Sequence, residues 1–249
     1  MKKGILSKSA LQYIAAAAML AGHTAFLADS FAAAYFMTFF SRITIVIMCM
    51  FVAEGFYKTH DLNKYALRLA VCAAVSQLPY YFFRIGTLPQ GVYSFLAGNY
   101  SARSVIFTLL VGLMLLSVLK SGMRYRYKLA ALVCALFITR NSDWGFVGVM
   151  SIAVFGMFHG SFKKQACAFV VVLFVYFIAK HFGMTVQFAL MGEIDINMLL
   201  NSVSYAGCLL ALPLIALYNG KRGACPKYAL YIFYPAHLAA LFIIKLLLS

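Results

Sequence analysis

Four ionisable side chains lie inside otherwise apolar segments that are long enough to cross a membrane: His23, Arg42, Glu54 and His237. Placing a charged side chain at the centre of a membrane helix costs about 2.5–3.5 kcal/mol on insertion scales. Such residues usually face a polar interior, pair with another group, and take part in chemistry or solute movement. Their presence predicts a functional site within the membrane rather than a passive anchor.

The types of these side chains indicate proton transfer and stabilisation of negative charge. A histidine exchanges a proton near neutral pH, so we expect His23 to act as a general base. An arginine can hold a carbonyl, a carboxylate or an oxyanion, which is the role expected for Arg42. A carboxylate can orient an imidazole, and Asp143 is the candidate, with His237 close by. The alternatives are helix-packing roles, for His23 with a neighbouring hydroxyl or carbonyl and for His237 with a carbonyl freed by Pro235.

The composition is that of an integral membrane protein. The chain is 64% hydrophobic and 11% charged, with a mean hydropathy of +0.90, whereas a soluble domain is about half apolar and a quarter charged. The polar loops are too short to form a soluble core, so residues 1–249 are expected to be a single transmembrane domain. The first residues resemble the start of a signal peptide, but 10–28 is too long for its apolar part. We therefore expect a retained first helix.

Hydropathy predicts an all-α polytopic membrane protein with about nine transmembrane helices. A helix that crosses perpendicular to the bilayer needs about 20 residues, with a range of roughly 17–25. The fifth and sixth segments are short, so they are expected to be tilted, re-entrant, or a broken pair around 141–143. The expected segments are 10–28, 33–56, 65–83, 104–119, 127–140, 144–158, 166–182, 197–218 and 228–248.

The net charge of +15 is distributed as expected for a membrane protein. Most of the 21 basic residues lie in short clusters between apolar runs, which predicts a cytoplasmic N-terminus and an external C-terminus. This placement favours anionic lipid head groups or an anionic cofactor at the cytoplasmic face as partners, and argues against nucleic acid. The six cysteines are scattered without a CxxC motif, so neither a metal site nor a disulfide framework is predicted.

The predicted orientation converts sequence position into depth, at about 1.5 Å per residue. His23 falls in the outer third of the first helix, and Arg42 lies at similar depth in the second. Asp143 begins the sixth helix at the outer face. These three side chains are expected to line one cavity that opens outward, with His237 beneath them near the midplane.

A basic, glycine-containing segment follows the eighth predicted helix on the cytoplasmic side. Its residues are Tyr218, Asn219, Gly220, Lys221, Arg222 and Gly223. Glycines beside cations let backbone and side chains approach phosphates, although a helix stop followed by cytoplasmic positive charge has the same pattern. Glu54 lies near Lys58, either on a cofactor path or in an interfacial ion pair. His60, His159 and His181 are expected to be solvated.

Short motifs occur in order over most of the chain. Met19–His23 is similar to M-x-x-D-H, Ser41–Phe56 to G-R-x-x-F-P-x-F-x-x-x-x-x-E-G-F, Ser104–Leu109 to N-x-x-F-T-L, and Asp143–Gly145 to D-Y-G. Leu217–Gly223 and Phe233–Leu238 give the closest match. In order and spacing these motifs resemble the TraX family, inner-membrane proteins linked to N-acetylation of conjugative F-type pilin.

This chain departs from the family pattern at three places. Gly22 stands where the family has an aspartate before the histidine, and Thr44–Val46 lacks the proline that follows the arginine. Ser104 replaces an asparagine. A substitute for the missing aspartate is therefore needed, and Asp143 and Glu54 are the acidic residues that match family motifs.

The resemblance implies acetyl transfer from acetyl-CoA to an amine or hydroxyl acceptor, by a multi-pass protein of the bacterial inner membrane. The concept is similar to that of transmembrane acyltransferases such as the heparan-glucosaminide N-acetyltransferase group, which take acyl-CoA from the cytoplasm and modify acceptors on the opposite side. The implied acceptor is a pilin N-terminus, a glycan or a lipid. Glu54, Tyr218, Asn219, Lys221 and Arg222 would bind acyl-CoA, and no metal is implied.

Two other functions fit the same residues. A proton-coupled transporter of small solutes would use the buried His, Arg and Glu as a proton relay, although the chain has no convincing internal repeat. A non-catalytic factor for pilus or envelope assembly would use them to hold helices together.

Overall fold

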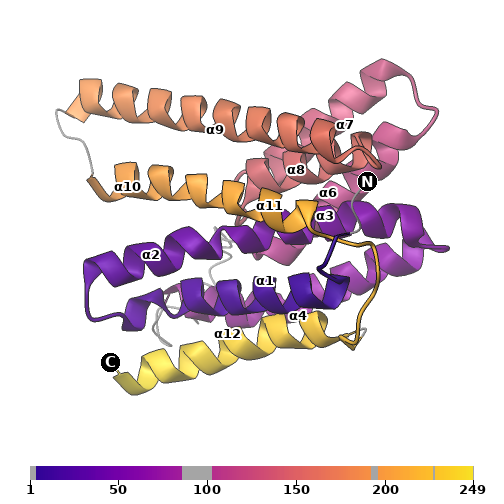
Figure 1. The fold of residues 1–249 in the computed structure, drawn as a ribbon. Helices are drawn as coiled ribbons and strands as arrows, with labels where there is room; N and C mark the ends of the chain where they lie inside the picture. The colour runs from indigo at the N-terminus through magenta and orange to yellow at the C-terminus, as the bar shows by residue number, and fades with distance from the viewer. Residues whose placement is uncertain (1–3, 86–102, 192–195, 227, 249) are drawn as a thin grey trace. The chain divides into compact units, whose positions relative to one another are not determined.

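A computed structural model describes residues 4–85, 103–191, 196–226 and 228–248. The secondary-structure elements formed by these residues are all helices (Figure 1). The chain forms two compact units. Unit 1 comprises Met1–Ile47 and Gly160–Gly223, and unit 2 comprises Met48–His159 and Ala224–Ser249. Helix α3 (Ile43–Lys58) begins in unit 1 and ends in unit 2.

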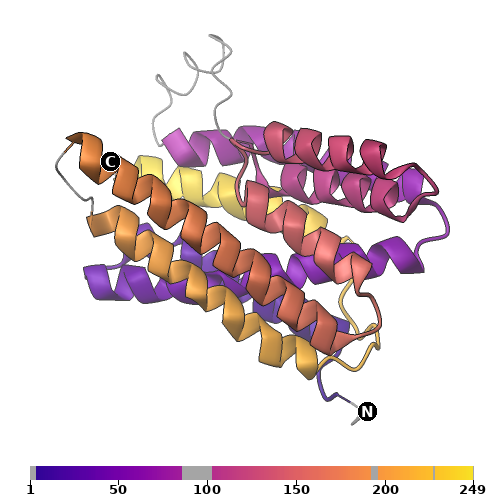
Figure 2. The same cartoon turned by 90° about the horizontal axis from the view of Figure 1, so that it is seen from above.

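Unit 1 is built around an α1–α2 hairpin and a second, longer helical hairpin. Its helices are α1 (Lys8–His23), α2 (Phe31–Ser41), α9 (Phe162–Met191), α10 (Ile196–Ser204) and α11 (Ala211–Ala216), with 3-10 turns η1 (Ala25–Leu27) and η2 (Tyr205–Leu210). In both views α9 runs beside the α10–η2–α11 segment (Figures 1 and 2). Helix α2 packs against α1, α10 and η2, and is therefore the central element of the unit.

Small residues set how closely the elements of unit 1 approach. Gly22 near the end of α1 faces Ser41 at the end of α2, and a Cβ at position 22 would overlap the Ser41 side chain. Gly207 in η2 lies against the backbone of Phe39, where a Cβ would overlap the carbonyl group. Close backbone approach at small residues is the usual way in which membrane helices associate. These two contacts place α1 and η2 directly against α2.

Unit 2 contains α4 (Leu62–Ile85), α6 (Val105–Lys120), α7 (Tyr125–Ile138), α8 (Gly145–Met157) and α12 (Ala229–Leu248). Helix α4 packs against α12 and α6, and α6 packs against α8. Two glycines allow the close contact between α6 and α8. A Cβ at Gly112 would overlap Ile152, and a Cβ at Gly156 would overlap Leu116. Asp61 Oδ1 accepts the Lys64 backbone N–H at 2.9 Å to begin α4, and this bond lowers the pKa of the Asp61 carboxyl.

Five of the described segments are long and apolar enough to cross a membrane, judged by length and composition. They are Phe31–Lys58, Leu62–Arg84, Phe162–Gly183, Leu199–Ala216 and Ala229–Leu248. The all-helical class and the presence of membrane-length helices are thus confirmed. The number of nine spans and the orientation of the two termini stay predictions, as does the organisation of the chain as one transmembrane domain.

Each predicted segment overlaps a helix, but four differ in detail. The first, predicted as 10–28, ends as an α-helix at His23 and is followed by the 3-10 turn η1. The second predicted segment is divided at Arg42, whose backbone N–H bonds to Phe39 and Phe40 to close α2 before α3 begins. The eighth contains the 3-10 stretch η2 between α10 and α11. The seventh, predicted as 166–182, extends to 30 residues as α9. The short fifth and sixth segments form α7 and α8, joined by a turn over 139–144.

Candidate functional site

Arg42 is the best-positioned ionisable residue of unit 1. Its Nε and Nη2 donate to Ser204 Oγ at 3.1 and 2.9 Å, and Nη2 donates to Asn201 Oδ1 at 2.7 Å. Its guanidinium carbon lies 4.4 Å from the centre of the Tyr205 ring. Ser204 and Asn201 are neutral side chains, and their bonds fix the orientation of the guanidinium. Arg42 is therefore a positioned cation inside a segment of membrane length.

His23 ends α1 directly after the contact between Gly22 and Ser41, and Arg42 follows Ser41. The two candidate catalytic residues of unit 1 thus leave the backbone on either side of one close helix contact. His23 is half-buried. The backbones of His23 and Arg42 are therefore close to each other, and the cavity that both side chains are expected to line stays a prediction.

The same contact gives a physical reason for the missing aspartate. Because a Cβ at position 22 would overlap Ser41, an aspartate would need a smaller residue at position 41. The motif that this chain resembles has aspartate at the position of Gly22 and glycine at the position of Ser41. In this chain the larger residue of the pair is thus on α2, whereas in the motif it is on α1.

Asp143 lies in unit 2, in the turn that leads into α8. Its backbone N–H donates to the Arg103 carbonyl at 2.8 Å, and Thr108 Oγ1 donates to its carbonyl at 2.7 Å. Trp144, which follows, has a φ of 60°. Non-glycine residues in this left-handed region are uncommon and are often found at functional sites. The turn is thus held tightly from α6, the first turn of which carries Thr108.

His237 packs inside unit 2 on α12 and is 7% exposed. Its Nδ1 lies 2.8 Å from the Phe233 carbonyl, one turn earlier, and its ring stacks on Phe233 at 4.7 Å. It also meets the Tyr234 ring edge-on, with ring centres 5.6 Å apart. The Phe233 carbonyl is not the one that Pro235 frees, because the N–H missing at 235 would bond to the Tyr231 carbonyl, four residues earlier. That carbonyl accepts from the Cys72 thiol at 3.7 Å. The contact of His237 is thus a structural one, but not with the carbonyl that was predicted.

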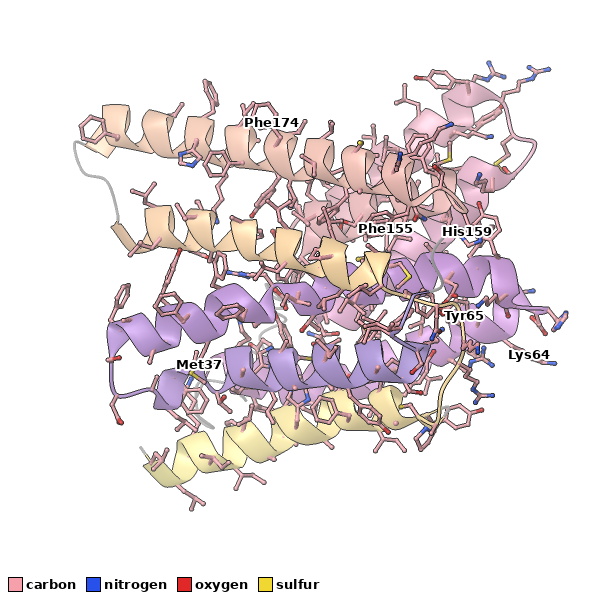
Figure 3. All side chains as sticks on the ribbon, viewed as in Figure 1. Met37, Lys64, Tyr65, Phe155, His159 and Phe174 are labelled. Atoms are coloured by element: carbon pink, nitrogen blue, oxygen red, sulfur yellow. The ribbon has the colours of Figure 1, made fainter. Side chains whose placement is uncertain are left out.

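Glu54 is buried near the end of α3, with 6% of its surface exposed. Lys58 Nζ lies 2.7 Å from Glu54 Oε1, one turn further along the helix. Gly55 lies against the phenol of Tyr65, and Figure 3 places Tyr65 beside Lys64 at the start of α4. The predicted alternative of an ion pair is confirmed for Glu54. A role on a cofactor path stays a prediction.

The basic segment 217–223 is held by the N-terminal residues. Leu6 exchanges two backbone hydrogen bonds with it, one to the Leu217 carbonyl and one from the Asn219 N–H, both 2.9 Å long. Asn219 Oδ1 also accepts the Lys221 N–H at 2.8 Å. Gly220 and Gly223 have φ of 75° and 74°, so the turn geometry itself favours glycine at these positions.

The segment also accepts hydrogen bonds from the first residues of α1. The backbone N–H groups of Lys8 and Ser9 donate to the carbonyls of Lys221 and Arg222 at 2.8 and 3.0 Å, and Ser7 Oγ caps the helix through the Ala10 N–H. These first-turn N–H groups could otherwise bind an anion. The exposed side chains of Lys221 and Arg222 are therefore the groups left to contact a phosphate.

The predicted site residues fall into two sets by unit. His23, Arg42 and the segment with Tyr218, Asn219, Lys221 and Arg222 belong to unit 1. Glu54, Asp143 and His237 belong to unit 2. The convergence of His23, Arg42, Asp143 and His237 on one cavity thus stays a prediction. Within the described residues, no group of three or more His, Cys, Asp or Glu side chains could hold a metal ion.

Comparison with known proteins gives the family directly. The model of the family described as "TraX protein" matches residues 7–245. The chain belongs to the TraX family. A curated relative, "Probable fimbrial assembly protein FimC, serogroup H1" from Dichelobacter nodosus, is 28% identical over 243 residues, which cover 96% of both chains. No solved structure matches.

The sequence interpretation missed several polar neighbours in this TraX protein. Asn201, Ser204 and Tyr205 contact Arg42 but lie about 160 residues away in sequence, and no motif marks them. His159, expected to be solvated, is exposed but stacks on Tyr57 with ring centres 4.0 Å apart. Figure 3 shows His159 just past α8, at the same end of unit 2 as Tyr65.

Proposed function

We propose that this TraX protein is an acyltransferase of the bacterial inner membrane. It moves an acyl group, acetyl in the first instance, from cytoplasmic acyl-CoA to an amine or hydroxyl at the outer face. The acceptor is a pilin N-terminus, an envelope glycan or a lipid. The family membership supports a role in the bacterial envelope, and the resemblance of its motifs supports acetyl transfer.

The observation that carries the proposal is the guanidinium of Arg42, held by Ser204 and Asn201 over the Tyr205 ring. A fixed, positively charged donor group is what an acyl transfer requires, because negative charge develops on the carbonyl oxygen in the transition state. Its rigid positioning means that little reorganisation is needed at the moment of reaction.

In this mechanism the acceptor nitrogen or oxygen attacks the thioester carbonyl while His23 takes its proton. Arg42 donates hydrogen bonds to the oxyanion that forms. The carbon–sulfur bond then breaks, and CoA leaves as a thiol with the proton that His23 returns. Asp143 and His237 are the candidates to orient the acceptor or the imidazole.

Lys221 and Arg222 would bind the phosphates of CoA at the cytoplasmic end of unit 1. From this segment, α11 and η2 lead back to Ser204, so one continuous helical stretch connects the phosphate end to Arg42. The pantetheine arm would run along this stretch. Tyr218 and Asn219 would hold the segment in shape, and Glu54 remains a candidate for binding the acyl-CoA.

A binding experiment separates this enzyme from the alternatives. Thermal unfolding of the purified protein is followed with acetyl-CoA and with dephospho-CoA. We expect stabilisation by acetyl-CoA that weakens when the 3′-phosphate is absent, since a ligand stabilises the folded state that binds it. A transporter of small solutes or an assembly scaffold would show no stabilisation by either compound, and that result would exclude the proposal.

A non-catalytic role in pilus or fimbrial assembly is the second candidate. The name of the Dichelobacter nodosus relative as a fimbrial assembly protein favours it, and so does the structural bond of His237 to the Phe233 carbonyl. In that case envelope proteins, glycans and lipids would have the same masses with and without this gene product. An acyltransferase would instead leave one of them lighter by the acyl group in its absence.

A further inference from the structure

Lys180 places a second cation on the ring that Arg42 contacts. It lies on α9 and is half-buried, with its Nζ 4.8 Å from the centre of the Tyr205 ring and 5.8 Å from that of Tyr176. Arg42 lies 4.4 Å from the Tyr205 ring. Both cations contact the same ring. The distance between Lys180 Nζ and the Arg42 guanidinium carbon is therefore smaller than the sum of their distances to the centre of that ring.

Two rings do not satisfy an ammonium group. Contact with an aromatic face attracts the charge, but the three N–H donors of a lysine need oxygen acceptors. Within the part of the chain that the structure describes, the contacts of Lys180 are those with Tyr176 and Tyr205. A lysine near the end of a membrane helix usually extends toward water, whereas this one turns toward Tyr205 and Arg42.

The neighbouring groups are suited to an oxyanion. The Tyr176 and Tyr205 rings pack against each other with centres 4.8 Å apart and an angle of 42°, and both rings contact the ammonium. Arg42 is anchored by Ser204 and Asn201 and cannot move away from Lys180 without losing those bonds. An anion that binds close to both cations would be attracted by each of them.

We propose that Lys180 and Arg42 together bind an anionic oxygen group, a carboxylate or a phosphate, over the Tyr205 ring. The ligand that carries it is either a soluble oxyanion or the head group of an anionic lipid. Arg42 supplies planar donors and Lys180 a point charge, a combination typical of oxyanion recognition. The site requires no acyl donor, so it can be tested independently of acyl transfer.

The test measures thermal unfolding of the protein in dodecyl maltoside at constant ionic strength. Sodium phosphate, sodium acetate or the water-soluble lipid dihexanoyl phosphatidylglycerol replaces sodium chloride stepwise. We expect a saturable rise in the unfolding midpoint with at least one of these anions. In Lys180→Gln the half-saturating concentration should increase about tenfold or more, because a charge-assisted contact is lost. Lys163→Gln removes the same charge from an exposed site on the same helix and should behave as wild type.

Each outcome decides the matter. A Lys180-dependent effect of phosphate or acetate identifies a soluble oxyanion, and an effect of the lipid alone identifies a head group. The proposal is wrong if no anion raises the unfolding midpoint above that in chloride. It is also wrong if Lys163→Gln weakens anion binding as much as Lys180→Gln does. Should Lys180→Gln fold poorly, Lys180→Met provides the same test, because it keeps the length of the side chain and removes the charge, and the same loss of anion affinity is expected.

Discussion

Arg42 is held through two of its nitrogens, and this geometry makes its chemistry testable. Nε and Nη2 both donate to Ser204, and Nη2 also reaches Asn201. A lysine has a single nitrogen and cannot reproduce the planar fork. Arg42→Lys should therefore reduce acyl transfer nearly as much as Arg42→Ala, measured as the rate of CoA release. Arg140→Lys, at an exposed arginine, serves as the control. Recovery of most of the rate by lysine would mean that a simple point charge suffices.

His23 should behave as a general base. A positioned base typically contributes 10²–10⁴-fold to the rate, so His23→Ala should lose about that much turnover while acetyl-CoA still shifts the unfolding midpoint. His60→Ala, which alters an exposed histidine, should retain full activity. Near-normal turnover in His23→Ala would leave this histidine with a packing role at the end of α1.

The contact between Gly22 and Ser41 predicts a compensating pair of substitutions. Gly22→Ala forces a methyl group against Ser41, and overpacking of this kind costs about 1–3 kcal/mol. Adding Ser41→Gly should restore most of the lost stability, since the two positions touch and their effects are not additive. The thermal unfolding midpoint measures both effects. Gly122→Ala, where nothing lies within 4 Å, should change it little. Additive destabilisation in the double variant would show that the two residues do not compete for the same space.

Single residues could be predicted from sequence only where their type is unusual for their surroundings. His23 and Arg42 stand out because they interrupt apolar runs. Lys180 lies near the end of such a run, where a lysine is ordinary, and its neighbour Tyr205 is an ordinary aromatic residue. Their proximity depends on how α9 packs beside η2, which hydropathy does not report.

At the scale of elements, the contact between the N-terminal residues and segment 217–223 determines what a basic loop can do. The backbone carbonyls of Lys221 and Arg222 accept N–H groups of α1, and their side chains remain exposed. Changing both to glutamine therefore leaves the backbone bonds in place. We expect a higher Michaelis constant for acyl-CoA with little change in maximal rate, as when ground and transition states lose the same contact. The difference in Michaelis constant between wild type and the double variant should shrink in high salt, because exposed charges are screened over about 8 Å already at physiological ionic strength.

The control for this pair is Lys163→Gln combined with Lys164→Gln, at two exposed lysines of the same unit. It removes the same charge from a site without a proposed phosphate role. A double variant at 221 and 222 that inserts poorly but has a normal Michaelis constant per folded molecule would assign the pair to topology alone. Kinetics and folded yield must be measured on the same preparation.

Helices were predictable where a long apolar run ends in polar residues, as at Leu62–Ile85 and Ala229–Leu248. The division at Arg42 and the 3-10 stretch Tyr205–Leu210 were not, because both lie within continuous apolar sequence. They face each other across Gly207 and Phe39. Backbone irregularity in membrane helices is tolerated where the protein buries it or lines a cavity, so the two irregular stretches coincide with the Arg42 site.

At the scale of the whole molecule, the candidate residues are divided between two units. The chain passes from one unit to the other within α3 and again near residues 159 and 223. Unit 1 holds the positioned cation and the basic segment, and unit 2 holds Asp143, His237 and the buried Glu54. Composition and motif order predicted the membrane class and the TraX family. The division into units was not predictable, since each is assembled from two stretches that are distant in sequence.

Transfer of label from acetyl-CoA across the membrane tests the proposed activity most directly. Vesicles with this protein are prepared so that radiolabelled acetyl-CoA contacts the cytoplasmic face, and envelope pilins, glycans and lipids are supplied at the opposite face. We predict that one acceptor class becomes labelled with wild-type protein and that the label falls to background with Arg42→Ala, which retains acetyl-CoA binding in the unfolding assay. Equal labelling by wild type and Arg42→Ala, or none with wild type, would contradict acyl transfer at this site.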